Sequence, residues 1–237
     1  FSAAGMILVE GYGLTETSPV ISVNDLRKGG LRIGSVGKVI DDVTVKIAED
    51  GEILCKGPNV MMGYYKEIEK TKEVMTGVFF HTGDIGVIDN DGFLKITDRK
   101  KEMFKTSGGK YIAPQVIENQ MKQSLFIEQI MVIGEGQKMP AALIQPNFDY
   151  IKNWFSQNGI AAEDDLVSIC KNQSLLDEIQ KEIDDHNQRF GEWEQIKKFE
   201  LTPEMWSIEN EFLTPTMKVK RNTLKTHYKD LITKIYQ

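Results

Sequence analysis

Up to about residue 97, hydrophobic and polar residues alternate in short runs that are typical of β-strands. Residues 43–47 place valine and isoleucine at every second position, the Asp50-Gly51 pair suits a tight turn, and residues 53–55 resume the alternation. Residues 87–96 repeat the arrangement around an Asn-Asp-Gly turn. The pattern therefore predicts two β-hairpins.

Two other segments complete this first part of the chain. Gly5–Glu10 is a short apolar run, and we expect it to form a buried strand. Residues 67–75 suit a short surface helix. Several short strands joined by glycine turns predict a small barrel-like subdomain over residues 1–97.

After Asp98-Arg99 the pattern changes to alternating strands and helices. Pro114 suits a first helical position, and apolar residues follow it at helical spacing up to Leu125. We expect strands at Ile127–Ile133 and Ala141–Ile144 and helices at Asn147–Asn158 and Ser174–Arg189.

The end of the chain predicts one last helix. Asn222 can cap it, and its apolar face consists of Leu224, Tyr228, Leu231, Ile232 and Ile235. The fold class we predict is α+β: a β-rich, barrel-like part at residues 1–97, followed by a small mixed α/β domain at residues 98–237. A helical insert at about residues 147–195 belongs to that second domain.

The composition argues against several classes of protein. The 29 basic and 35 acidic residues give a net charge of −6, which argues against a dedicated nucleic-acid-binding domain. Cys55 and Cys170 are too few for a disulfide framework or a zinc cluster, so we interpret them as reduced thiols of a cytoplasmic protein. No apolar run approaches the length of a transmembrane segment, although peripheral association with the inner membrane face stays open.

Charge is unevenly distributed along the chain. Lys95–Lys110 contains six basic and two acidic residues, and Thr214–Lys229 contains five basic residues and no acidic one. Each run is typical of a solvated surface, but basic loops rich in Gly, Thr or Pro also suit a phosphate-bearing ligand. The chain has neither a Gly-x-x-x-x-Gly-Lys-Ser/Thr loop nor a Gly-x-Gly-x-x-Gly fingerprint, so a P-loop NTPase or a Rossmann dehydrogenase is unsupported.

The stretch Gly11–Thr17 contains the first group of candidate binding residues. Its glycines, Gly13 among them, allow the backbone to approach a ligand closely. Tyr12 offers a ring that can stack on a base, Thr15 a hydroxyl for phosphate, and Glu16 a hard oxygen ligand for Mg²⁺. The alternative interpretation is an ordinary polar loop.

Other candidates lie further along the chain. Asp84 can accept hydrogen bonds from two adjacent sugar hydroxyls, or it can be an ordinary turn residue. The segment from Asp98 to Lys110 suits a basic loop facing an anion, and Lys218 on a proline-stiffened loop can neutralise developing negative charge. The alternative interpretations are a solvated surface hairpin for the segment from Asp98 to Lys110 and a solvated loop for the segment around Lys218.

Taken together and in this order, the segments resemble the adenylate-forming enzymes, which include acyl-CoA synthetases, luciferases and peptide-synthetase adenylation domains. The resemblance extends over nearly the whole chain, and Glu10–Thr17 looks like the long-chain fatty acid branch. The matching motifs are Gly11-Tyr12-Gly13-Leu14-Thr15-Glu16-Thr17, Gly34-Ser35-Val36-Gly37-Lys38, Gly51-Glu52-Ile53, Met62-Gly63-Tyr64-Tyr65, His81-Thr82-Gly83-Asp84, Asp98-Arg99-Lys100-Lys101-Glu102 and Pro215-Thr216-Met217-Lys218.

The resemblance implies a two-step ligase with ATP, Mg²⁺ and CoA. A fatty acid carboxylate attacks the α-phosphate of ATP to give acyl-AMP and pyrophosphate, and the CoA thiol then displaces AMP. The implied roles, by motif match, are Tyr12 and Gly13 at adenine, Thr15 at the α-phosphate, Glu16 on magnesium, Asp84 and Arg99 at the ribose, Asp98 as hinge, Lys218 as the adenylation lysine, and Lys105, Gly108 and Gly109 along the CoA channel.

Three departures from the family pattern matter. Met217 replaces the glycine that usually precedes the final lysine, and Phe79 stands where a tryptophan is usual. The phosphate-binding loop and the acyl tunnel would lie upstream of Phe1, so we expect the C-terminal portion of a longer enzyme, inactive alone. Two alternatives stay open: a relative that loads a carrier protein instead of CoA, and a non-catalytic relative. The oligomeric state stays open too.

Overall fold

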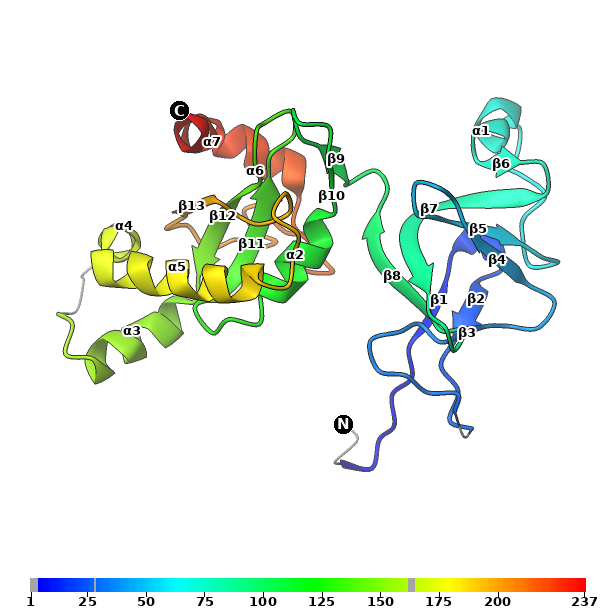
Figure 1. Cartoon of the computed structure of the whole chain (residues 1–237), viewed down its shortest axis with the longest axis horizontal. Helices are drawn as coiled ribbons and strands as arrows, with labels where there is room; N and C mark the ends of the chain where they lie inside the picture. Colours follow the sequence, from blue (N-terminus) through cyan, green and yellow to red (C-terminus); the bar gives the residue numbers. More distant parts are fainter. Residues whose placement is uncertain (1–3, 28, 162–164) are drawn as a thin grey trace. The chain divides into compact units, whose positions relative to one another are not determined.

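The computed structural model describes residues 4–27, 29–161 and 165–237. Its chain separates into an N-terminal unit, Phe1–Glu102, and a C-terminal unit, Met103–Gln237 (Figure 1). Residues 162–164, within the predicted helical insert, lie outside the described residues.

Antiparallel strands form most of the N-terminal unit. The first sheet has the order β1-β2-β3, and the second has the order β4-β5-β7-β6 with β8 paired to β7. Its elements are β1 (Gly11–Gly13), a 3₁₀ turn η2 (Thr15–Thr17), β2 (Val20–Val23), β3 (Lys38–Val39), β4 (Thr44–Ile47), β5 (Glu52–Lys56), α1 (Ile68–Glu73), β6 (Met75–Thr76), β7 (Phe79–Ile88) and β8 (Leu94–Arg99).

Both predicted hairpins are confirmed. In the first, Val45 pairs with Cys55 and Ile47 with Ile53, and the turn aspartate Asp50 accepts the Glu52 amide. In the second, Asp89 accepts two amides of its own turn, those of Asp91 and Phe93. The apolar sides of these strands meet in a core that contains Tyr12, Ile21, Ile53, Cys55 and Leu94.

The predicted strand at Gly5–Glu10 is wrong. Met6, Ile7, Leu8 and Val9 are all exposed, and the first strand begins at Gly11. In the part of the chain that the structure describes, this apolar run has no partner strand, and a strand is stable only when its backbone groups pair with a neighbour.

A mixed three-stranded sheet forms the centre of the C-terminal unit. Strand β12 pairs antiparallel with β11 and parallel with β13. The elements of this unit are β9 (Phe104–Lys105), β10 (Tyr111–Ile112), α2 (Pro114–Met121), β11 (Ile127–Ile133), β12 (Ala141–Pro146), α3 (Phe148–Gln157), α4 (Leu166–Lys171), α5 (Gln173–Asn187), β13 (Lys198–Leu201), α6 (Arg221–His227) and α7 (Lys229–Tyr236).

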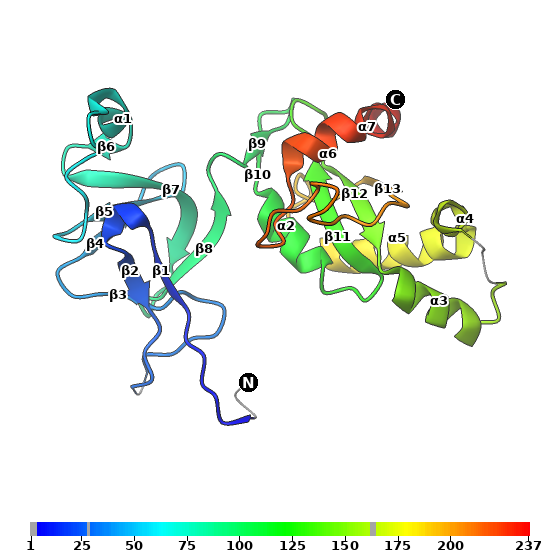
Figure 2. The same ribbon diagram turned by 180° about the vertical axis from the view of Figure 1, so that it is seen from behind.

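Alternate residues of the sheet enter two separate cores. Ile130 and Ile144 pack with helices α2 to α5, whereas Met131 and Leu143 pack with Trp206 and helices α6 and α7. The three strands therefore lie between two groups of helices (Figures 1 and 2). The α+β fold class is as predicted.

Three details of this unit differ from the sequence-based expectation. The last helix is interrupted at Tyr228, and Asn222 lies inside α6, whose N-cap is Lys220. Leu125 is exposed beyond the end of α2. Helix α4 was not predicted, because its six residues are too few to show a helical period; Asp165 caps it by accepting the Ser168 amide.

Neither cysteine forms a disulfide: Cys55 is buried and Cys170 is half-buried. No helix among the described residues is both long and apolar enough to cross a lipid bilayer.

Candidate functional site

Asp84 of β7 contacts one side chain from its paired strand β8 and one from β1, which belongs to the other sheet. The Tyr12 hydroxyl on β1 donates to Asp84 Oδ2 over 2.7 Å, and Arg99 Nε on β8 lies 2.9 Å from Oδ1. Asp84 and Arg99 are direct register partners, so strand pairing itself sets this contact. Burial raises the pKa of Tyr12, and the hydrogen bond to Asp84 raises it further.

The geometry leaves Asp84 able to accept more hydrogen bonds. A carboxylate has about four acceptor positions, and Tyr12 and Arg99 each occupy one. Asp84 is only 3% exposed, whereas the Arg99 side chain is about half exposed. A buried carboxylate held in one orientation is suited to accept from hydroxyl groups of a ligand. The structure thus brings together three residues, Tyr12, Asp84 and Arg99, that the sequence motifs place far apart.

Glu16 lies in η2, next to β1. Its Oε1 accepts from the Tyr64 hydroxyl over 2.9 Å, and its backbone oxygen accepts the Met61 amide over 2.8 Å. These bonds attach the Met62–Tyr65 motif to the Gly11–Thr17 motif. The turn itself is closed by Thr17, whose hydroxyl accepts the Leu14 amide, while Thr15 stays exposed.

Oε2 of Glu16 takes no part in these bonds. A single carboxylate oxygen of this kind fits a magnesium site in which phosphate supplies the other ligands. The described residues contain no group of three or more side chains that could hold a metal ion without such help.

Gly13 is required by the packing of its own hairpin. A Cβ atom on Gly13 would lie 1.6 Å from the carbonyl oxygen of Pro19, whereas one on Gly11 would come no closer than 3.4 Å to its neighbours. The sequence suggested that this glycine lets the backbone approach a ligand closely. In the structure, the group that comes close to Gly13 is the Pro19 carbonyl of the same hairpin.

Glu52 is the centre of a polar network that the sequence did not single out. It is 3% exposed, and it accepts from Lys100 Nζ over 2.7 Å and from the Gly83 amide over 3.0 Å, with His81 Nδ1 at 2.8 Å. Burial alone would raise the pKa of Glu52, but the hydrogen bonds from Lys100 and His81 outweigh it, and the net pKa is lowered. The network ties the His81–Asp84 motif to the Asp98–Glu102 motif.

A signal for Glu52 was present in the sequence. Glu52 belongs to the Gly51-Glu52-Ile53 motif, and it directly precedes the apolar residues of β5. Asp98, the predicted hinge residue, is 1% exposed, and its Oδ1 accepts the Arg99 amide over 2.6 Å.

In the C-terminal unit, Lys105, Gly108 and Gly109 lie on the short β9–β10 hairpin. Gly109 has a left-handed φ of 81°, and Lys105 Nζ lies 5.4 Å from the centre of the Tyr111 ring. Lys110 Nζ lies 5.0 Å from the half-exposed ring of Trp193, which follows α5. This hairpin thus presents two ammonium groups together with two exposed aromatic rings.

Lys218 is at the end of a tight turn. The Thr214 amide donates to the Lys218 oxygen over 2.8 Å, and the Lys218 amide donates to Thr214 Oγ1 over 3.0 Å. Met217, where the family has glycine, has a φ of 60°. The turn therefore keeps the left-handed conformation that glycine favours, and the Lys218 side chain is exposed.

Arg221, three residues further on, is in a different environment. Its Nη2 lies 2.6 Å from both carboxylate oxygens of buried Glu118, and Nη1 donates to the Val132 oxygen. Burial raises the pKa of Glu118 to about 7, and the nearby Arg221 opposes this rise. Arg221 is thus a structural residue and not one more charge on a basic loop.

Comparisons with known proteins agree with these motifs. Residues 1–65 match the family model described as AMP-binding enzyme, and residues 102–237 match the AMP-binding enzyme C-terminal domain. The chain is 36% identical over 236 residues to long-chain-fatty-acid–CoA ligase FadD15 of Mycobacterium bovis, covering 100% of this chain and 39% of the relative. It is 35% identical to long-chain-fatty-acid–CoA ligase 1 of Homo sapiens, covering 99% and 35%. The chain thus spans between 35% and 39% of the length of these curated relatives.

Solved structures show the same fold. The A domain of carboxylic acid reductase from Segniliparus rugosus, in complex with AMP and a co-purified carboxylic acid, has a TM-score of 0.73 at 20% identity, covering 99% of this chain and 36% of that one. An ATP-bound RpMatB-BxBclM chimera has a TM-score of 0.70 at 25% identity, covering 98% and 42%.

Proposed function

This chain belongs to the AMP-binding enzyme family, and on that premise we propose that it is part of an ATP-dependent ligase that joins a long-chain fatty acid to CoA. The observation that carries the proposal is the buried Asp84 carboxylate, held by Tyr12 and Arg99 with acceptor positions to spare. Similarity to fatty-acid–CoA ligases along the whole chain supports the choice of acid.

The proposed first half-reaction is attack of the fatty acid carboxylate on the α-phosphate of ATP, which releases pyrophosphate and leaves acyl-AMP. Asp84 accepts hydrogen bonds from the ribose hydroxyls, and Arg99 holds that carboxylate in place and adds a donor. Tyr12 orients Asp84 through its hydroxyl; its ring is 9% exposed and packs in the core of the N-terminal unit, so we place adenine against the small part of the ring that stays accessible, beside Gly13. Thr15 donates to the α-phosphate.

Glu16 would hold Mg²⁺, and the Tyr64 hydroxyl on its Oε1 orients it for that purpose. When bound, the ion would neutralise phosphate charge.

Lys218 supplies positive charge to the same half-reaction. Negative charge increases on the α-phosphate oxygens as the carboxylate attacks, and an ammonium group aimed at them stabilises that transition state. The exposed position of Lys218 on a hydrogen-bonded turn supports this role.

In the second half-reaction the CoA thiol attacks the acyl carbon, the thioester forms and AMP leaves. We assign Lys105, Gly108 and Gly109 to the channel for the CoA arm, because this hairpin combines ammonium groups with small residues that leave room for a ligand. Asp98 is the proposed hinge residue; it lies shortly before Glu102, where the N-terminal unit ends.

The test uses the complete protein that carries this chain. Palmitate should stimulate isotope exchange between pyrophosphate and ATP, and palmitoyl-CoA should form once CoA is added. Asp84→Asn should raise KM for ATP at least tenfold, about 1.4 kcal/mol, whereas Asp41→Asn, an exposed aspartate of the same unit, should leave KM unchanged.

Two results would contradict the proposal. Absence of palmitate-dependent exchange would remove the fatty acid as substrate. Exchange without any thioester product would mean that another acceptor, such as a carrier protein, replaces CoA.

A further inference from the structure

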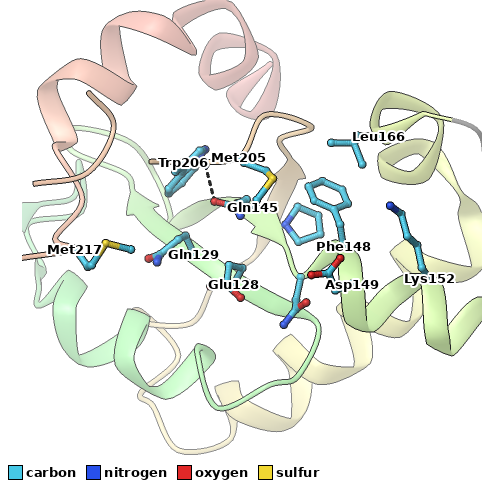
Figure 3. A pocket seen from close by; sticks show the side chains of 12 residues that line it. Glu128, Gln129, Gln145, Phe148, Asp149, Lys152, Leu166, Met205, Trp206 and Met217 are labelled. Atoms are coloured by element: carbon cyan, nitrogen blue, oxygen red, sulfur yellow. Dashed lines mark hydrogen bonds between the residues drawn. The ribbon is translucent and has the colours of Figure 1, made fainter. Parts of the chain in front are cut away.

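A pocket of about 420 Å³ lies in the C-terminal unit, where β11 begins, β12 ends and α3 starts (Figure 3). Its volume falls in the range of small-molecule sites. None of the residues that the sequence motifs assign to ATP or CoA lines it, although Met217, the neighbour of Lys218, does.

Three side-chain amides line this pocket, and each has its oxygen engaged by the protein. Gln129 Oε1 accepts from Lys122 Nζ over 2.6 Å, and Gln145 Oε1 accepts the Trp206 amide over 2.8 Å. Asn147 Oδ1 accepts the Tyr150 amide over 3.1 Å.

The partners fix the orientation of these amides. An ammonium group and a backbone amide can only donate, so the atom that faces each of them must be oxygen. The NH₂ groups are therefore turned away from these partners. Gln129 and Gln145 are direct register partners on β11 and β12, so both side chains lie on the same face of the sheet, at the pocket (Figure 3).

Both glutamines are well buried: Gln145 is 3% exposed and Gln129 is 8% exposed. In the described parts of the chain, neither NH₂ group has a hydrogen-bond partner. Neither nitrogen belongs to the fully enclosed, unpartnered polar atoms of the described residues, so both are open to the pocket and can donate to a molecule that accepts hydrogen bonds there.

Charge and apolar surface narrow the chemistry of that molecule. Glu128, Asp149 and Lys152 are the charged residues of the lining, and Lys122, which is not a lining residue, adds a second positive charge at Gln129 Oε1. These two carboxylates would repel a phosphate with several negative charges more strongly than a molecule with a single negative charge. The remaining lining is apolar and includes Phe148, Leu166, Met205 and Trp206.

We propose that this pocket binds a small amphipathic monocarboxylate, with its carboxylate on the amide groups of Gln129 and Gln145 and its apolar body against Phe148 and Trp206. Such a molecule would also contact Met217 and hence the turn that presents Lys218. The site is separate from the residues that the proposed ligase reaction uses.

The test measures binding of octanoate to this chain by calorimetry and by ¹⁵N NMR of the side-chain amides. Octanoate should bind saturably and shift the Gln129 and Gln145 resonances, whereas octan-1-ol and octylamine should bind at least tenfold more weakly. Gln145→Glu and Gln129→Glu keep the shape and the accepting oxygen but replace the NH₂ donor with an anionic acceptor, so each should weaken octanoate binding at least tenfold.

Gln157→Glu is the matched control, because it adds the same charge at an exposed position on α3 and should leave the octanoate Kd within twofold. No saturable binding, equal binding of octylamine, or full affinity in both pocket variants would overturn the proposal. If one pocket variant fails to fold, the other variant and the amide shifts of the parent protein still decide the question.

Discussion

At the scale of single residues, Lys218 gives the sharpest test of the proposed reaction. Lys218→Ala in the complete protein should slow acyl-AMP formation by about 10²–10³, because one electrostatic contact to the transition state is lost. Conversion of supplied acyl-AMP and CoA into thioester should continue close to the parent rate. Single-turnover kinetics of both half-reactions measures the difference.

The matched control is Lys220→Ala, since Lys220 precedes α6 and its side chain makes no capping hydrogen bond. Arg221 is unsuitable as a control because it is paired with buried Glu118. Equal losses in the two half-reactions, or an equal loss from Lys220→Ala, would reduce Lys218 to a surface charge.

Glu52 leads to a prediction on pH dependence. Its pKa is lowered in the folded state, so its stabilising contribution is present above the unfolded value, about 4.3, and is lost as pH falls through the folded pKa. Glu52→Gln should therefore reduce the free energy of unfolding of the N-terminal unit at pH 7, and the gap to the parent should close with acidification. Amide hydrogen exchange in β5 and β7 at pH 7 and at about pH 3, well below the unfolded value, checks this, and a gap that stays constant would contradict it.

At the scale of elements, the β1–β2 hairpin depends on one glycine. Gly13→Ala should destabilise the N-terminal unit by about 2 kcal/mol or more, because the added Cβ collides with the Pro19 carbonyl and the backbone must shift. Gly11→Ala in the same strand should cost less than about 1 kcal/mol, since its Cβ would have ordinary contacts. Thermal unfolding followed by circular dichroism compares the two, and similar losses would contradict the packing argument.

The Glu118–Arg221 pair joins α2 and α6 to β11. Arg221→Ala should cost about 3–5 kcal/mol, because it leaves a buried carboxylate without its partner. The double variant Glu118→Leu with Arg221→Met should recover most of that loss. All three tryptophans lie in the C-terminal unit, so their fluorescence in urea reports the unfolding of this unit.

The control for that pair is Lys225→Ala, which removes a more exposed contact with Glu135 and should cost less than about 1 kcal/mol. A loss from Arg221→Ala no larger than this would show that the buried pair is not needed.

At the scale of the whole molecule, we expect residues 103–237 to fold without the N-terminal unit. Among the described residues, both core clusters of the C-terminal unit consist only of residues from Phe104 onward, so a cut before Met103 leaves both clusters complete. The NMR spectrum of residues 103–237 should overlay on the matching peaks of the longer chain, and unfolding should be cooperative. Poorly dispersed peaks would show that the N-terminal unit is required.

The sequence alone determined the local elements and the order of the motifs. The hairpins at residues 43–55 and 87–96 were predictable because alternation and turn residues act over a few neighbouring positions. The same local information led to two wrong predictions. At Gly5–Glu10 an apolar run has no strand to pair with among the described residues, and the predicted N-cap Asn222 is replaced by Lys220, two residues earlier. The motifs also predicted the family, because several of them occur in the same order.

Tertiary structure decided which side chains meet. Asp84 receives Tyr12 from 72 positions away, and Arg221 reaches Glu118 across 103 positions. Strand register and helix packing set these contacts, and no local pattern reports them. The Glu52 network and the amide-lined pocket also depend on tertiary structure. Their amino-acid types can be read from the sequence. The burial of Glu52 requires the pairing of β5 with β7, and the position of the two glutamine amides at the pocket requires the pairing of β11 with β12.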